Sequence, residues 1–239
     1  MADVNGCCSP RGLILQHGPW APPGLLGDWA RARGIAVDVH RADLGEPLPE
    51  LEDRAFVASL GDYCNPGDVH VAHVAAERHF VAEAVARDVP VLGLCFGGQM
   101  LAAVLGGGIE PAPAPELGWC TINSTDRRVP EGPWLQWHYD RFTLPPGAVQ
   151  LATSPNGVQA FSHGRHLGVQ FHPESTIEIV RGWAASQADR LRALGIEDGD
   201  ALLERGRPVA RAAAGAAFRL FDAFWERAAA PTGITASAR

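Results

Sequence analysis

The stretch Val89-Pro90-Val91-Leu92-Gly93-Leu94-Cys95-Phe96-Gly97-Gly98-Gln99-Met100-Leu101 indicates which fold the chain adopts. Its apolar start predicts a buried strand, and its glycine-rich centre predicts an abrupt turn into a helix. Cys95 stands between Gly93 and Gly97, which is the G-x-nucleophile-x-G pattern of a nucleophile elbow. Small flanking residues allow a strained backbone there, and the helix N-terminus that follows favours a thiolate. An inert buried cysteine beside a tight turn is the other interpretation of this stretch alone.

The segments before this stretch alternate between strand and helix patterns. Strands are predicted at 11–16, 35–39 and 56–60, and helices around 25–34 and 74–85. This order predicts an α/β fold whose central sheet is mainly parallel, with helices on both faces.

The pattern changes after Gly108, where the strand candidates become short and closely spaced. They lie at 119–123, 134–138, 148–153, 157–162 and 167–171. Such spacing predicts antiparallel additions to the parallel sheet. Two helices are predicted to complete the chain, one over about 175–194 and one carrying a core-facing stripe of Phe218, Phe221 and Trp225.

Composition narrows the classes of function. The 239 residues include 20 basic and 27 acidic side chains, for a formal net charge of −7, and no dense basic run. Nucleic acid is therefore not expected as a partner. A membrane is not expected either, because no apolar run is long enough to span a bilayer. Residues 1–10 lack a signal-peptide pattern, and five irregularly spaced cysteines do not predict disulfides. We expect a cytoplasmic protein with one domain over residues 1–230 and a frayed tail at 231–239.

A second motif supplies what a cysteine nucleophile needs, namely a base and a group that orients the base. In the segment Val169-Gln170-Phe171-His172-Pro173-Glu174, alternation predicts a strand that ends at His172, because Pro173 breaks the ladder. Residues i and i+2 of extended backbone share a face, so Glu174 can accept a hydrogen bond from His172. A strand-end histidine with a solvated glutamate is the interpretation favoured when this motif is taken alone.

Together the two motifs resemble the class I glutamine amidotransferases, the glutaminases with a Cys-His-Glu site. Residues 116–119, ELGW, are similar to the E-x-G-W segment of that family. Residues 137–140, WHYD, occupy the place of the S-H-G-D segment in the glutaminase domains of guanylate synthetases. The resemblance, which extends to γ-glutamyl peptidases, implies a flavodoxin-like fold. It also implies a stand-alone enzyme that hydrolyses the side-chain amide of glutamine or a related γ-glutamyl compound.

The resemblance also implies a role for each residue. Cys95 would attack the amide carbon, and His172 would take the thiol proton and pass it to the departing ammonia. Glu174 would stabilise the imidazolium, while the backbone N–H groups of Phe96 and of the loop at Gly61 would bind the oxyanion. The residues implied at the substrate are Gln99, His138, Tyr139 and Asp140.

Two departures from the family pattern leave alternatives open. Asp62 follows Gly61 where the family has a proline, and Trp137 replaces the usual serine. A peptidase acting on larger γ-glutamyl conjugates, or a regulatory subunit with weak catalysis, could share these features. A cysteine hydrolase of the α/β-hydrolase fold, with Asp140 as the acid, is a further alternative. Any protein that uses the released ammonia is expected to be a separate synthetase.

No cofactor or metal is expected. His70, His73 and Glu77 fall at i, i+3 and i+7, so one helix face could present them to a metal, but solvated polar residues are the favoured interpretation. The glycines at 106–108 match neither the dinucleotide pattern nor a phosphate-binding loop.

Overall fold

The computed structural model describes residues 11–195 and 199–229, so the predicted frayed tail lies outside the described residues. Within those two ranges, no helix is long and apolar enough to cross a membrane.

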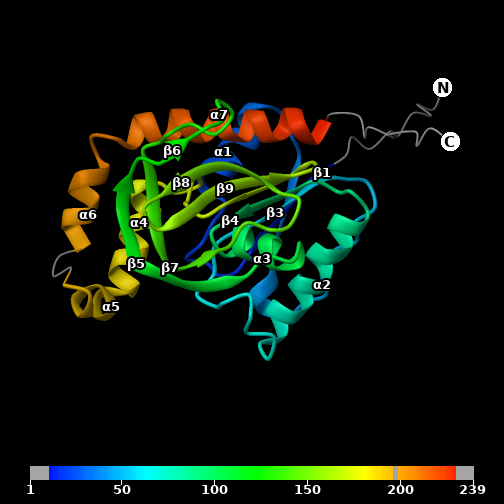
Figure 1. The fold of residues 1–239 in the computed structure, drawn as a ribbon, viewed down its shortest axis with the longest axis horizontal. Coiled ribbons are helices and arrows are strands. Elements are labelled where there is room, and N and C mark those ends of the chain that lie inside the picture. Colours follow the sequence, from blue (N-terminus) through cyan, green and yellow to red (C-terminus); the bar gives the residue numbers. More distant parts are fainter. Residues whose placement is uncertain (1–10, 196–198, 230–239) are drawn as a thin grey trace, which may run out of the picture.

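An eight-stranded sheet forms the centre of the molecule (Figure 1). In spatial order its strands are β2 (Val37–Arg41), β1 (Arg11–Gln16), β3 (Arg54–Ser59), β4 (Val91–Leu94), β10 (His166–Val169), β9 (Gly157–His163), β8 (Val149–Ser154) and β6 (Asn123–Ser124). The first five run parallel and the last three are antiparallel additions, which confirms the predicted sheet. The second strand begins two residues later than predicted.

Helices cover both faces of this sheet because its strands are apolar on both sides. Leu13 and Leu15 of β1 join the core cluster under α2 (Ala72–Ala86) and α3 (Phe96–Val104). Ile14 points the other way, into the core cluster under α1 (Gly24–Ala32) and α7 (Ala210–Ala229). A short 3-10 turn, η1 (Ala42–Leu44), follows β2.

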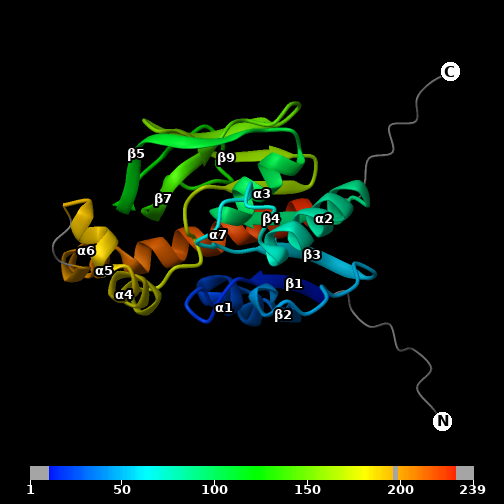
Figure 2. The same cartoon turned by 90° about the horizontal axis from the view of Figure 1, so that it is seen from below.

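A second, two-stranded sheet pairs β5 (Ile109–Cys120) with β7 (Trp134–Phe142). Figure 2 shows it at the end of the molecule remote from β1 and β2. The strand predicted at 119–123 therefore has the wrong bounds, and the strand predicted at 134–138 lies in this second sheet rather than in the central one. β5 begins at Ile109 and runs through three prolines, with a register shift between Pro111 and Glu116. An edge strand tolerates proline because one side of its backbone needs no ladder hydrogen bond.

The C-terminal helices also differ from the prediction. The helix expected over 175–194 is divided at Gln187 into α4 (Ile177–Ser186) and α5 (Ala188–Ala193). An unpredicted helix, α6 (Gly199–Gly206), follows, and all three pack on the second sheet through a third core cluster. In α7, Phe221 and Phe224 are fully buried, whereas Phe218 and Trp225 are only partly buried.

Candidate active site

Cys95 occupies the turn between β4 and α3 in a conformation that side chains rarely adopt, with φ 52° and ψ −106°. The two flanking glycines make this turn possible. A Cβ on Gly97 would lie 2.1 Å from the Ser59 carbonyl oxygen, and a Cβ on Gly93 would lie 2.3 Å from the Gly97 carbonyl oxygen. The strained elbow predicted from the sequence is therefore present, and it places the sulfur at the carboxyl end of the central sheet.

His172 reaches Cys95 because β10 is the strand beside β4. Leu94 pairs with Val169, and the Cys95 amide donates to the Val169 carbonyl at 2.9 Å. The chain then leaves the sheet, and the His172 amide donates to Leu135 of β7 at 2.9 Å. The parallel pairing of β4 with β10 thus brings together two residues that are 77 positions apart in the chain.

Glu174 lies against the other side of the imidazole. Nδ1 of His172 donates to Oε1 of Glu174 at 2.7 Å, and both side chains are buried. The carboxylate thus fixes the tautomer and orientation of the ring. Asp140 does not take this place, because its carboxylate accepts a hydrogen bond from Asn65 Nδ2 at 2.9 Å instead.

The electrostatics of the site favour a charged nucleophile. Burial by itself would lower the pKa of His172, but the negative charges of Cys95 and Glu174, and hydrogen bonds to both, raise that pKa well above its ordinary value. Gln170, which is fully buried, adds an N–H directed at the Cys95 sulfur at 3.8 Å. The imidazole therefore keeps its proton near neutral pH, and the Cys95 sulfur faces a positively charged partner.

A third strand end completes the arrangement. The loop after β3 is tied to the first turn of α3, because the Gly97 amide donates to the Leu60 carbonyl at 3.1 Å. In the part of the chain that the structure describes, the amides of Gly61 and Phe96 donate to no protein acceptor. Gly61 faces the catalytic side, since a Cβ there would lie 2.9 Å from Cε1 of His172. These two amides are thus available to an oxyanion.

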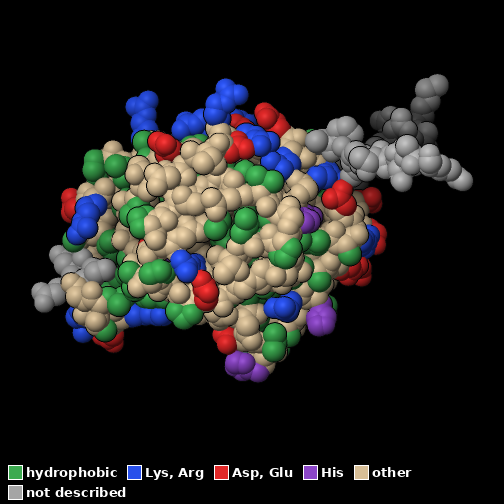
Figure 3. All heavy atoms as spheres, viewed as in Figure 1, with side chains coloured by type: hydrophobic (Ala, Val, Ile, Leu, Met, Phe, Trp, Pro, Cys, Tyr) green, Lys and Arg blue, Asp and Glu red, His purple; other side chains and the backbone are tan. Residues whose placement is uncertain are grey.

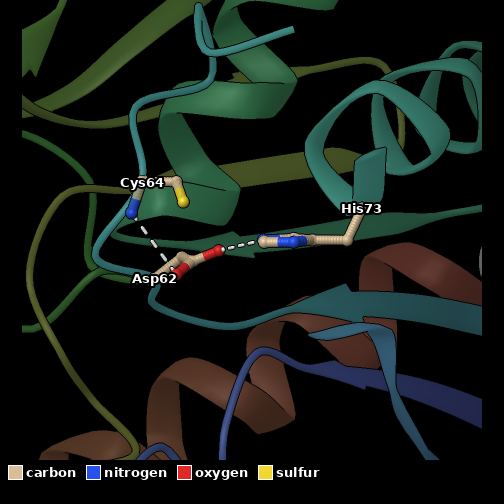
Figure 4. Close-up of side chains that lie close together, drawn as sticks. All are labelled: Asp62, Cys64 and His73. Atoms are coloured by element: carbon tan, nitrogen blue, oxygen red, sulfur yellow. Dashed lines mark hydrogen bonds and ion pairs between the residues drawn. The ribbon is translucent and has the colours of Figure 1, made fainter. Parts of the chain in front are cut away.

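Asp62, the residue that departs from the family pattern, is turned toward α2. Its Oδ2 accepts a hydrogen bond from His73 Nε2 at 2.7 Å, as Figure 4 shows. Its Oδ1 accepts a hydrogen bond from the Tyr63 amide at 2.6 Å. A positive or donating partner therefore faces each carboxylate oxygen. The acid is held by its own loop rather than being directed at the developing oxyanion.

The predicted triplet of His70, His73 and Glu77 does not form. Glu77 is fully buried, so the expectation of a solvated residue is wrong for it. His73 instead lies with Asp62 and Cys64, whose possible ligand atoms are all within 4.8 Å of one another. Burial and the nearby charges of Asp62 and Asp68 raise the pKa of the Cys64 thiol to about 11. These three residues could contact a metal, although structural zinc takes four ligands.

A buried ion pair that the sequence did not reveal lies beneath the Gly61 loop. His17 Nε2 contacts Glu77 Oε2 at 2.5 Å, and His17 Nδ1 contacts the Gly61 carbonyl oxygen at 3.2 Å. Ser59 donates to the other oxygen of Glu77 at 2.5 Å. Burial alone would lower the pKa of His17, but the charge and hydrogen bond of Glu77 raise it. Both ring nitrogens can therefore donate, and the imidazolium holds the Gly61 peptide in place.

The residues predicted to bind substrate line one cavity of about 180 Å³ beside Cys95. Gln99 donates to the Asp140 carbonyl at 3.1 Å, which braces the wall of this cavity. Both ring nitrogens of His138 are used by protein groups, because Nδ1 contacts the Asp140 carbonyl and Nε2 contacts Glu116 at 3.0 Å. His138 thus supports the wall, and the sequence did not indicate two further lining residues, Gln187 and Arg190.

A smaller cavity of about 30 Å³ lies beside His172 and shares Cys95 and Trp137 with the first. His172 forms part of its wall, and the remaining wall is mainly aromatic: Trp20, Tyr63, Trp137 and Trp183. The Trp183 ring packs edge-on against the His172 ring, with centroids 4.7 Å apart. Its indole N–H donates to the Trp20 carbonyl at 2.7 Å, which fixes the position of the wall.

Comparisons with known proteins agree with this geometry. Residues 30–180 match the model of the family "Glutamine amidotransferase class-I". The GMP synthase of Phenylobacterium zucineum is 34% identical over 178 residues, which are 68% of this chain and 32% of that protein. A protein of Salmonella typhimurium named "putative glutamine amidotransferase-like protein YfeJ" is 28% identical, with 71% of this chain and 77% of that protein covered.

Two further comparisons concern chain organisation and fold. One subunit of the glutamine-hydrolysing GMP synthase of Sulfolobus acidocaldarius is 39% identical over 97 residues, covering 36% of this chain and 52% of its own length. The crystal structure of a glutamine amidotransferase from Thermotoga maritima superposes with a TM-score of 0.84 at 28% identity, covering 91% of this chain and 99% of that one. The present chain spans about a third of the length of the GMP synthase of Phenylobacterium zucineum.

Proposed function

This chain belongs to the class I glutamine amidotransferase family, and from that premise we propose that it releases ammonia from the side-chain amide of glutamine. The observation that carries the proposal is the buried contact series from Cys95 through His172 to Glu174 at the carboxyl ends of β4 and β10. A thiolate, its proton carrier and the group that orients the carrier are the parts that amide hydrolysis through a thioester needs.

The proposed reaction has two stages. The Cys95 thiolate attacks the amide carbon, and the amides of Gly61 and Phe96 bind the resulting oxyanion. His172 gives its proton to the amide nitrogen of the substrate, and the carbon–nitrogen bond breaks. Ammonia departs, and a thioester remains on Cys95. His172 then takes a proton from water, the hydroxide displaces sulfur, and glutamate is released with the thiolate restored. Glu174 stabilises the imidazolium through both stages.

The sizes of the two cavities support glutamine over larger γ-glutamyl conjugates. The leaving group must lie next to His172, where the cavity measures about 30 Å³. Three tryptophans wall this cavity, which favours a small leaving group such as ammonia over a bulky amine. The larger cavity, about 180 Å³, is below the roughly 300 Å³ of sites for drug-sized ligands and suits one amino acid.

We further propose that a separate synthetase uses the ammonia. Support comes from the relatives, since the names of the GMP synthases describe a glutamine-hydrolysing synthetase and one is named as a subunit of such an enzyme.

The test is the release of glutamate and ammonia from glutamine by the purified chain. We expect equal amounts of the two products, with activity lost in Cys95→Ala and kept in Cys120→Ala, which removes an exposed cysteine. Glutamine should be preferred over γ-glutamyl peptides and γ-glutamyl amines. Absence of product from every γ-glutamyl compound, together with a Cys95 that a diazoketone analogue of glutamine does not label, would contradict the proposal and favour a binding subunit.

A further inference from the structure

Arg190 is a cation of the substrate cavity that has no carboxylate partner among the described residues. Its guanidinium carbon lies 3.6 Å from the centre of the Tyr139 ring. Arg190 is exposed to solvent, and stacking of this kind orients its planar group while leaving the N–H donors free at the edge. An arginine with free donors in this orientation matches the two oxygens of a carboxylate.

Acidic groups balance this cation elsewhere in the same cavity. Asp140 and Asp68 both line it, and each accepts a hydrogen bond from Asn65, at 2.9 Å from the side chain and 2.8 Å from the backbone amide. These neutral donors leave the two carboxylates without a cationic partner among the described residues. The third acid of the cavity, Asp62, is paired with His73. The cavity therefore offers a positive group and negative groups to one ligand.

Two further polar groups of the wall lack protein partners. The indole N–H of Trp137 and the hydroxyl of Tyr139 are buried without a hydrogen bond in the described ranges. Buried polar groups are rarely left unpaired in folded proteins, so such groups beside a cavity indicate a polar ligand. The combined lining is complementary to a zwitterion rather than to an apolar or singly charged molecule.

We propose that Arg190 binds the α-carboxylate of the substrate. This inference rests on the proposed function and adds a specificity-determining residue to it. Arg190 lies beyond residues 30–180, the segment that matches the family, and it is carried by α5. Recognition of the α-carboxylate is thus supplied by a C-terminal helix of this chain.

The test measures binding in the Cys95→Ala background, so that it does not depend on turnover. Calorimetry compares L-glutamine with its α-amide, which lacks the carboxylate, and with 4-carbamoylbutanoate, which lacks the ammonium group. Arg190→Gln is expected to weaken binding of glutamine roughly 10- to 100-fold. The same change should alter binding of the α-amide by less than about 3-fold, because the group that Arg190 recognises is already missing.

Arg192→Gln is the matched control, since Arg192 lies on the same helix, is exposed and pairs with Asp189. It should bind all three compounds as the parent does. The carboxylate assignment is wrong if the parent binds glutamine tightly and Arg190→Gln weakens the binding of glutamine and of its α-amide equally. It is also wrong if Arg190→Gln weakens the binding of neither compound. In both cases the glutaminase proposal stands. If the parent binds the α-amide as tightly as glutamine, the assignment is likewise wrong. Failure of the proposed function itself appears separately, as absence of hydrolysis with Cys95 intact.

Discussion

Cys95 and His172 share one proton, and its position determines whether the sulfur can attack. The raised pKa of His172 means that the imidazole keeps this proton near neutral pH. A positively charged partner therefore faces the sulfur before substrate arrives.

Alkylation of Cys95 by iodoacetamide should reveal this arrangement. At pH 7 the rate in the parent protein should exceed the rate in His172→Gln by about tenfold, because the imidazolium stabilises negative charge on the sulfur. The Cys95→Ala protein is the control, because the pKa of Cys64 is raised to about 11 and that thiol should react slowly. Equal rates in the parent and His172→Gln would show that the imidazolium does not act on the sulfur.

The His17–Glu77 pair contacts the Gly61 peptide, whose amide is the proposed oxyanion donor, and does not contact the substrate cavity itself. Glu77→Gln should lower kcat about tenfold with little change in KM, because it releases an oxyanion donor and not a substrate contact. It should also destabilise the fold by about 3 kcal/mol, whereas Glu83→Gln on the exposed face of α2 should cost less than about 0.5 kcal/mol.

The pH dependence of that stability difference follows from the raised pKa of His17. A raised pKa stabilises the folded state fully below the unfolded value, about 6.5, and the effect is lost as pH rises through the folded value. Urea unfolding of the parent and Glu77→Gln should therefore differ most near pH 6 and less at higher pH. A difference that grows with pH would contradict a charged His17.

At the scale of elements, the strand–turn–helix of β4 and α3 has no room for side chains at its glycines. Gly97→Ala should destabilise the protein by more than about 3 kcal/mol, because its Cβ would meet the backbone of β3 at 2.1 Å. Gly182→Ala in α4 is the contrasting change. Nothing lies within 4 Å of its Cβ, so the variant should gain about 0.5–1 kcal/mol from helix propensity. Thermal unfolding of both proteins measures the two effects, and a tolerated Gly97→Ala would contradict the tight elbow.

Features with a local cause could be predicted from the sequence. The elbow at Cys95 depends on glycines two residues away, and the His172–Glu174 pair depends on i, i+2 geometry. Contacts made by tertiary packing could not be predicted, since no local pattern links His17 to Glu77 or α5 to the cavity. Helix propensity likewise did not reveal the break at Gln187. The prolines of β5 argued against a strand there, and such a strand is possible only at the edge of a sheet.

At the scale of the whole molecule, three core clusters stabilise different parts of the structure. Two lie on the faces of the central sheet, and the third joins the C-terminal helices to the wall of the site through Trp137 and Trp183. On the face drawn in Figure 3, basic side chains gather along the edge where α7 and β6 lie, with acidic side chains among them. The aromatic wall of the site is positioned by apolar packing of α4–α6.

This division predicts different consequences for two similar core changes. Leu202→Ala in α6 and Leu220→Ala in α7 remove equally buried side chains, and each should destabilise by about 2–4 kcal/mol. Only Leu202→Ala should also raise KM for glutamine, because it loosens the cluster that carries Trp183 and the helix with Arg190. Steady-state kinetics below the unfolding temperature distinguish the two. Equal KM values would show that the third cluster does not position the site.

The small aromatic cavity beside His172 has a consequence for the order of events. Nδ1 of His172 is held by Glu174, so a single ring nitrogen in this cavity must serve both the departing ammonia and the attacking water. On the proposed mechanism, departure of the first product thus becomes a precondition for the second half-reaction. The thioester therefore lasts until ammonia has left the position beside His172.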